Sequence, residues 1–220
     1  MKVLVVAPHP DDEILGCGGI IAKNVKEGNE VYVCITTDAC EPLFSKQDYE
    51  IDKKQIRDSH SYLGVNETCF LHFPAAMLDS VPKYQINDAF CKLIKQINPD
   101  EVYIPHRGDM HIDHKIVVDA CMVALRPRSK KNVKRIYAYE TLSETDWDIP
   151  NAVNAFIPNV YVDITKYIDK KVKAMEKYKN QICEYPNPRS AEGIKALAMH
   201  RGSTVSVNYA EAFMLIREIK

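Results

Sequence analysis

Short apolar runs alternate with longer amphipathic segments in the first half of this 220-residue chain, and this alternation restricts the fold more than any other feature. Strands are predicted at residues 2–7, 30–37, 68–73 and 101–105, where β-branched residues are frequent. Helices are predicted after them, at residues 14–26, 46–63, 84–97 and 114–125, from apolar residues spaced three and four apart. Parallel strands joined by crossover helices produce this order. We therefore expect an α/β fold, a Rossmann-like three-layer sandwich around a mostly parallel sheet.

The second half continues with further strands and helices. Strands are predicted at residues 133–139 and 160–163, and helices at residues 169–181 and 190–201. A basic loop at residues 126–132 precedes the first of these strands. Because no repeat, low-complexity tract or linker divides the chain, we expect a single domain spanning residues 1–220.

Composition excludes several classes of protein. The 29 Lys and Arg residues nearly balance the 30 Asp and Glu residues, so nothing in the bulk charge favours a nucleic-acid partner. The seven cysteines are scattered and odd in number, which argues against a disulfide framework and predicts a reducing, cytoplasmic location. The first apolar run is too short for a signal peptide, and no stretch approaches the ~18 apolar residues of a transmembrane segment.

Histidines and acids concentrate in two loops that follow predicted strands. Residues 8–13 read Pro-His-Pro-Asp-Asp-Glu, and residues 105–114 read Pro-His-Arg-Gly-Asp-Met-His-Ile-Asp-His. These loops hold four of the seven histidines and five acidic residues. Ligands of open α/β sheets bind outside the carboxyl ends of the strands, so both loops are expected at the ligand-binding edge.

The first loop is predicted to be stiff and to need a cation. Pro8 and Pro10 restrict the residues before them to extended conformations, so His9 and Asp12 are presented from a rigid turn. Three consecutive acids, Asp11 to Glu13, repel one another unless positive charge lies nearby. A helix N-terminus supplies only about half a charge, so a divalent cation is expected.

The two loops together predict a catalytic metal site. His9, Asp12 and His114 can supply three ligands and leave one coordination position open, as in catalytic zinc sites. Asp11 is then the candidate general base. His111 is the candidate donor of a hydrogen bond or proton to the oxyanion or leaving group, with Asp113 to orient it. This set of groups predicts metal-assisted hydrolysis of an amide or ester.

Both loops resemble those of a known family. Residues 8–13 with Gly16, Gly18 and Gly19 behind them, together with residues 109–114, closely resemble the LmbE-like (PIG-L) family of zinc-dependent N-deacetylases. The resemblance continues through Leu63-Gly64, Tyr139-Glu140 and residues 209–213, so it covers nearly the whole chain.

The resemblance implies removal of N-acetyl groups from N-acetylglucosamine-type amino sugars. It also implies zinc on His9, Asp12 and His114, with Asp11 as base and His111 with Asp113 as the pair of acid and orienting residue. This agrees with the roles that the two loops predict.

Departures from the family pattern concern substrate recognition. The turn at residues 37–41 reads Thr-Asp-Ala-Cys-Glu where the family often has Thr-Asp-Gly-Glu, and Ala75 replaces a frequent acid. Lys53 or Lys54 occupies the region where the family usually has a substrate-contacting arginine, and Lys53 is the candidate substrate-binding residue. Lysine lacks the planar fork of arginine, and sugar contacts are expected to differ.

Several alternatives stay open at this point. Two histidines and one carboxylate also suit Fe²⁺ and describe the facial triad of non-haem Fe(II) oxygenases. A nucleotide-binding module is weakly supported, because Gly16-Cys17-Gly18-Gly19 lacks the GxGxxG spacing. The sequence also leaves open whether the sugar is nucleotide- or lipid-linked and whether the chain forms a homo-oligomer.

Overall fold

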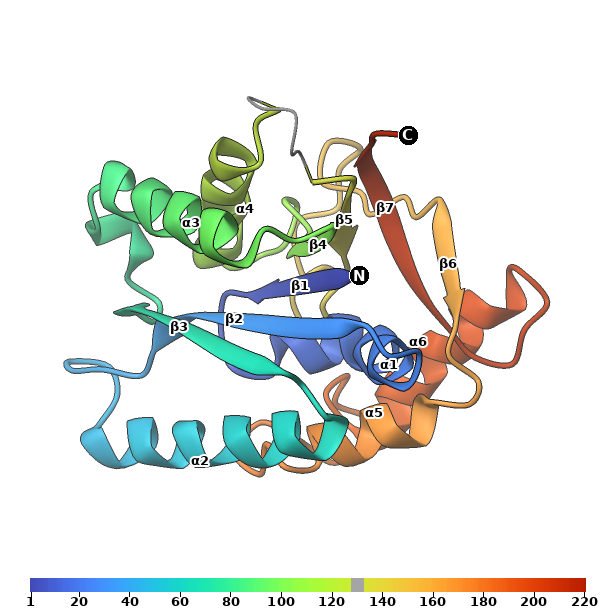
Figure 1. Ribbon diagram of the computed structural model, residues 1–220. Coiled ribbons are helices and arrows are strands. Elements are labelled where there is room, and N and C mark those ends of the chain that lie inside the picture. The colour runs from blue at the N-terminus through green and yellow to red at the C-terminus, as the bar shows by residue number, and fades with distance from the viewer. Residues whose placement is uncertain (128–132) are drawn as a thin grey trace.

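A seven-stranded sheet in the order β3-β2-β1-β4-β5-β7-β6 runs through the computed structural model, which describes residues 1–127 and 133–220 (Figure 1). Strands β1 to β5 are parallel to one another, β7 is antiparallel to β5, and β6 is antiparallel to β7. The strands are β1 Lys2–Ala7, β2 Glu30–Asp38, β3 Glu67–Pro74, β4 Glu101–Pro105, β5 Arg135–Tyr139, β6 Val160–Asp163 and β7 Ala210–Glu218.

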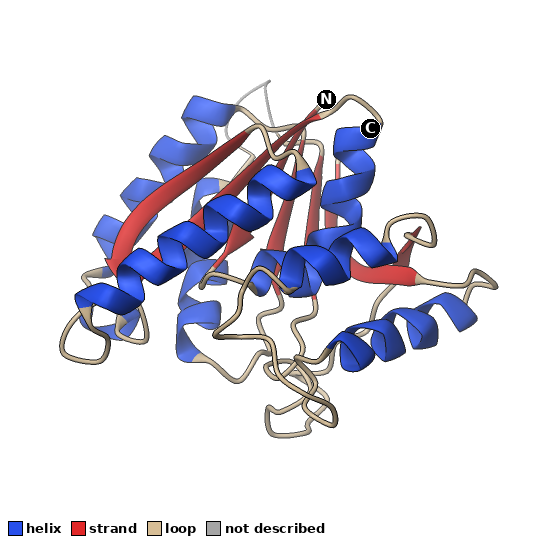
Figure 2. Ribbon diagram, turned by 90° about the horizontal axis from the view of Figure 1, so that it is seen from below, coloured by secondary structure: helices blue, strands red, loops and turns tan. Residues whose placement is uncertain are grey.

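Helices cover both faces of this sheet and complete three layers. Figure 1 shows α3 Lys83–Ile97 and α4 Ile112–Ala124 above the sheet and the remaining α-helices below it, and Figure 2, seen from below, shows this lower group in front of the strands. The lower helices are α1 Asp12–Lys26, α2 Lys46–Leu63, α5 Ile168–Met175 and α6 Ala191–Ser203. A short 3-10 helix, η1 Leu78–Ser80, follows β3.

Alternation along the central strand divides the core in two. Val3 and Val5 of β1 face the cluster that contains α1, α2, α5 and α6, whereas Leu4 and Val6 face the cluster that contains α3 and α4. A strand that is buried on both faces explains why the β1 run is almost wholly apolar. The expected α/β sandwich with a mostly parallel sheet is therefore confirmed.

Two elements differ from the sequence prediction. Strand β7 was not predicted, because residues 212–216 are continuously apolar and give no period of two. Helix α5 ends at Met175 instead of residue 181, and the chain continues through turns before α6. The predicted basic loop overlaps residues 128–132, which lie outside the described residues. No helix in the described parts of the chain is both long and apolar enough to cross a membrane.

The strand order places one crevice at the centre of the sheet. Chain connections leave β1 toward β2 on one side and reach β4 on the other, so the sheet has its topological switch point between β1 and β4. Such switch points bind ligands at the carboxyl ends of the strands. The two histidine-rich loops follow β1 and β4, and the fold therefore brings them together.

Candidate metal centre

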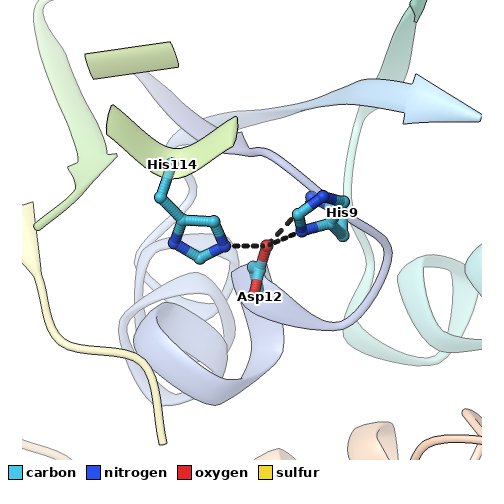
Figure 3. A group of neighbouring side chains, drawn as sticks. All are labelled: His9, Asp12 and His114. Atoms are coloured by element: carbon cyan, nitrogen blue, oxygen red, sulfur yellow. Dashed lines mark hydrogen bonds and ion pairs between the residues drawn. The ribbon is translucent and has the colours of Figure 1, made fainter. Parts of the chain in front are cut away.

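His9, Asp12 and His114 converge at the switch point (Figure 3). His9 lies in the loop after β1, and Thr37 of β2 holds that loop through a 2.8 Å hydrogen bond from its hydroxyl to the Pro8 carbonyl. Asp12 is the first residue of α1, and His114 is the third residue of α4. The structure thus brings together the three predicted ligands from residues 105 positions apart in the chain.

The spacing of the ligand atoms suits a tetrahedrally coordinated metal ion. Asp12 Oδ2 lies 3.4 Å from His9 Nδ1 and 3.2 Å from His114 Nε2. Zinc–ligand bonds of about 2.0–2.1 Å in a tetrahedron place ligand atoms about 3.4 Å apart. The observed separations therefore match two edges of such a site.

His114 carries a second sign of metal binding. Its buried Nε2 lies 3.2 Å from Asp12 Oδ2 without an aligned hydrogen bond, and it makes no hydrogen bond with any other atom in the described part of the chain. Its other ring nitrogen, Nδ1, lies 2.8 Å from Asp109 Oδ2, and Asp109 also accepts a 2.6 Å hydrogen bond from Thr145. A carboxylate that fixes one ring nitrogen while the other is unpartnered is the usual arrangement around metal-ligating histidines.

The carboxylates at this centre favour positive charge beside them. Burial lowers the pKa of His9, but hydrogen bonds to Asp113 and Asp12 outweigh it and raise that pKa to about 9. Burial also lowers the pKa of His114. The charge of Asp12 and the hydrogen bond to Asp109 outweigh burial and raise that pKa to about 10. Both imidazoles thus hold protons in the metal-free protein. A metal ion would displace these protons, since ligating histidine must be neutral.

Asp11, the candidate base, is buried beside the ligands. Burial raises the pKa of Asp11 well above its ordinary value, and the nearby Arg189 only partly offsets this effect. The residue has φ 102°, in the left-handed region, and it caps α1 by accepting the amides of Ile14 and Leu15 at its carbonyl. A raised carboxylate pKa in a crevice is typical of a general base.

Arg189 and Glu144 belong to the site, although the sequence analysis did not identify them. Arg189 Nη1 donates to Asp11 Oδ2 over 2.9 Å and to Gln181 Oε1 over 2.8 Å, and its Nε donates to Ser143 Oγ over 2.7 Å. Glu144 accepts the amide of His111. These residues come from loops after β5 and α5, and no local motif marks them.

His111 and Asp113 lie beside the three ligands but do not meet through their side chains. The His111 ring is 4.4 Å from the His9 ring between centroids. The carboxylate of Asp113 instead lies 3.1 Å from His9 Nε2. His9, His111 and Asp113 also form a second group within ligand range of one another. Burial lowers the pKa of His111 to about 4, and the charges of His9 and His114 act in the same direction.

A cavity of about 430 Å³ opens at the ends of β2 and β3, next to the loop that carries His9. Its lining includes Asp38, Tyr49 and His72. Lys53, the candidate substrate-binding residue, is not among the lining residues. Its ammonium lies over the ring of Tyr49, 4.8 Å from the centroid. The structure therefore places Lys53 one aromatic ring away from this cavity.

Comparison with known proteins finds relatives along most of the chain. A family model described as GlcNAc-PI de-N-acetylase (PIG-L) matches residues 4–125, which contain both histidine-rich loops. The uncharacterized deacetylase YaiS of Escherichia coli is 30% identical over 188 residues, covering 81% of this chain and 90% of the relative. A probable N-acetyl-alpha-D-glucosaminyl L-malate deacetylase 2 of Bacillus cereus is 26% identical over 191 residues, covering 81% of this chain and 83% of the relative. The solved structure of the conserved protein TT1542 from Thermus thermophilus has a TM-score of 0.79 at 27% identity, covering 99% of this chain and 96% of that one.

Proposed function

This chain belongs to the GlcNAc-PI de-N-acetylase (PIG-L) family, and on that premise we propose that it is a zinc-dependent hydrolase that removes the N-acetyl group from an N-acetylated amino sugar. The observation that carries the proposal is the convergence of the ligand atoms: the buried Nε2 of His114 lies at tetrahedral-edge distance, 3.2 Å, from Asp12 Oδ2, and Asp109 holds the other ring nitrogen. His9 supplies the third ligand. Fe²⁺ suits the same ligands, so metal identity is part of the test.

Each neighbouring residue has a role in this reaction. A zinc ion on these ligands would supply Lewis acidity, which makes water a nucleophile near neutral pH. Asp11 takes a proton from the attacking water and returns it to the nitrogen as the amide C–N bond breaks, giving acetate and a free amine. His111 donates a hydrogen bond to the carbonyl oxygen as negative charge develops there.

The sugar and its substituent are proposed to extend toward the cavity lined by Asp38, Tyr49 and His72. The Bacillus cereus relative is named for an N-acetylglucosaminyl malate, which supports an N-acetylglucosamine conjugate as substrate. Lys53 is proposed to reach the substrate past Tyr49, which lines this cavity and carries the Lys53 ammonium over its ring. Nucleotide-linked and lipid-linked sugars are alternative substrates to a small conjugate. We also propose that the chain forms a homo-oligomer.

The oxygenase alternative receives no support from the relatives. The Escherichia coli and Bacillus cereus proteins are both named as deacetylases. Hydrolysis needs neither oxygen nor a co-substrate, and this difference separates the two chemistries.

A cytoplasmic location is proposed from the seven cysteines, all of which have free thiols.

The test is acetate release by metal-reconstituted protein. The chain is stripped with a chelator and reloaded with Zn²⁺, or with Fe²⁺ under anaerobic conditions. It is then assayed with N-acetylglucosamine and N-acetyl-α-D-glucosaminyl L-malate, with His114→Ala as the control. We expect metal-dependent acetate release without oxygen uptake, absent in the variant. Oxygen consumption coupled to turnover, or no acetate from any N-acetylhexosamine conjugate, would overturn the proposal.

A further inference from the structure

The carboxylate of Asp113 is fully committed to partners other than His111. Its Oδ2 lies 3.1 Å from His9 Nε2 and accepts the amide of Ala76 over 2.7 Å. Its Oδ1 accepts the amide of Leu78 over 3.2 Å. The side chain is completely buried. Backbone amides can only donate, so Asp113 is held as an acceptor and its one remaining contact is with His9.

His111 has a structural task that determines its proton. It is the N-cap residue of α4, and its Nδ1 accepts the backbone amide of Asp113 over 3.1 Å. A ring nitrogen that accepts an amide hydrogen carries no proton of its own. The neutral His111 ring therefore carries its hydrogen on Nε2, which has no hydrogen-bond partner among residues 1–127 and 133–220 and can meet a substrate.

His9 has the complementary arrangement. Its Nε2 faces Asp113 and its Nδ1 faces Asp12, so the two ring nitrogens point to different carboxylates. When Nε2 donates its hydrogen to Asp113, the lone pair of Nδ1 is directed toward Asp12 and the metal position. His114 is held in the same manner, with Asp109 on one ring nitrogen and the metal position at the other.

We propose that Asp113 is a positioning residue for the metal ligand His9, and that His111 acts as a neutral hydrogen-bond donor fixed by the N-cap of α4. This assignment rests on the proposed metal site. It replaces the expected pairing of His111 with Asp113. Each histidine ligand then has its own buried carboxylate, Asp113 for His9 and Asp109 for His114. The proton for the leaving amine comes from Asp11, because a neutral donor capped at Nδ1 cannot relay one.

The same contacts argue against a second ion on His9, His111 and Asp113. An ion at His111 Nε2 would require the ring proton to move to Nδ1, which would then face the Asp113 amide. The Asp113 oxygens already accept two backbone amides and contact His9 Nε2, which leaves the carboxylate little capacity for an ion. One ion per chain is therefore expected.

The test separates metal affinity from turnover. Zinc Kd is measured by competition with a chromophoric chelator for the wild type, Asp113→Ala, Asp113→Asn and His111→Asn, and kcat is measured at saturating zinc. Loss of an orienting carboxylate typically weakens metal binding about 10–100-fold. We expect that loss in Asp113→Ala and a smaller one in Asp113→Asn, which keeps one acceptor oxygen. His111→Asn retains a capping side chain, so it should keep the wild-type zinc Kd while kcat falls.

Two controls make each outcome decisive. Asp109→Asn should weaken zinc binding like Asp113→Asn, and urea unfolding of the metal-free variants shows whether the chain is folded. Nitrogen-15 NMR of the imidazoles should find His111 protonated on Nε2 only, which does not depend on the Asp113 variants folding. Wild-type zinc Kd in Asp113→Ala, with kcat reduced as in His111→Asn, or His111 protonated on Nδ1, would overturn this assignment alone. A wild-type chain that binds no zinc would overturn the metal site itself.

Discussion

Asp11 has an unusual backbone conformation. A φ of 102° is rare outside glycine and costs on the order of 1–3 kcal/mol. Glu13 holds the residue there by accepting the Asp11 amide over 3.1 Å. Glu13 is fixed in turn by His60 and by the hydroxyl of Tyr178, which donates over 2.6 Å. Strain that is maintained by a buried network of this kind is typical of catalytic positions.

Replacing the Asp11 carboxylate should separate catalysis from metal binding. Asparagine tolerates positive φ and has nearly the same shape, so Asp11→Asn should fold and retain zinc. Losing the base should lower kcat by about 10²–10⁴-fold. Metal content and acetate release are measured side by side, with His114→Ala as the variant that loses the metal. If Asp11→Asn lost as much zinc as His114→Ala, the division between base and ligand would be wrong.

Arg189 should set the pH range in which Asp11 works. The guanidinium lowers the pKa of Asp11 against the larger effect of burial. Removing it in Arg189→Met should raise that pKa further. Because the base must be ionised, the acid limb of kcat/KM should move to higher pH, and Arg189→Lys should restore part of the shift. The shift is measured in pH–rate profiles of the wild type, Arg189→Met and Arg189→Lys. If the acid limb of kcat/KM in Arg189→Met stayed at the wild-type pH, Arg189 would not set the pKa of Asp11.

Features of the secondary-structure elements that depend on residues close together in the chain could be predicted from the sequence. Pro8 and Pro10 stiffen one ligand loop, and the histidines and acids of each loop are close in sequence, so both loops could be predicted. Arg189 could not, because the turns between α5 and α6 carry it to Asp11 from 178 residues away. Strand β7 was missed for a related reason: its pairing with β5 and β6 depends on tertiary contacts and not on local periodicity.

Helix α1 approaches the sheet closely at Gly16. A methyl group added there would lie 2.1 Å from the Tyr139 ring. That ring cannot move freely, because its hydroxyl donates to the Val6 carbonyl over 2.8 Å. Gly16 is thus required for the packing that positions Asp11 and Asp12 at the start of α1.

Gly16→Ala should destabilise the protein by about 1–3 kcal/mol through overpacking. Urea unfolding monitors the effect. Gly28→Asn is the matched control, because nothing would contact a side chain at that position and asparagine tolerates its positive φ. A Gly16→Ala variant as stable as Gly28→Asn would show that α1 can retreat from the sheet.

At the scale of the whole molecule, a buried ion pair joins the two halves of the chain. Glu211 of β7 accepts the amides of Gly19 and Ile20 in α1, each over 2.7 Å. Lys171 of α5 donates to Glu211 over 2.7 Å and to the Leu15 carbonyl over 2.7 Å. The last strand is thereby attached to the helix that begins at the metal centre.

Removing one partner of this pair should be costly. Glu211→Gln leaves Lys171 buried without a carboxylate, which typically costs about 3–5 kcal/mol. Asp88→Asn breaks an exposed helical pair with Lys92 and should cost less than about 1 kcal/mol. Chemical unfolding of both variants compares the two losses. Equal losses would mean that the Lys171–Glu211 pair does not hold α1 and β7 together.

The ligands, their orienting carboxylates and the surrounding helices together support metal-dependent N-deacetylation at the switch point between β1 and β4. The most direct test of this activity is a zinc titration of the metal-free protein, with acetate release from N-acetylglucosamine and its conjugates measured at each step. Metal-dependent deacetylation at this site predicts that acetate release rises with added zinc and saturates at one equivalent per chain. Acetate release that is independent of zinc, or no release at one equivalent of bound zinc, would contradict it.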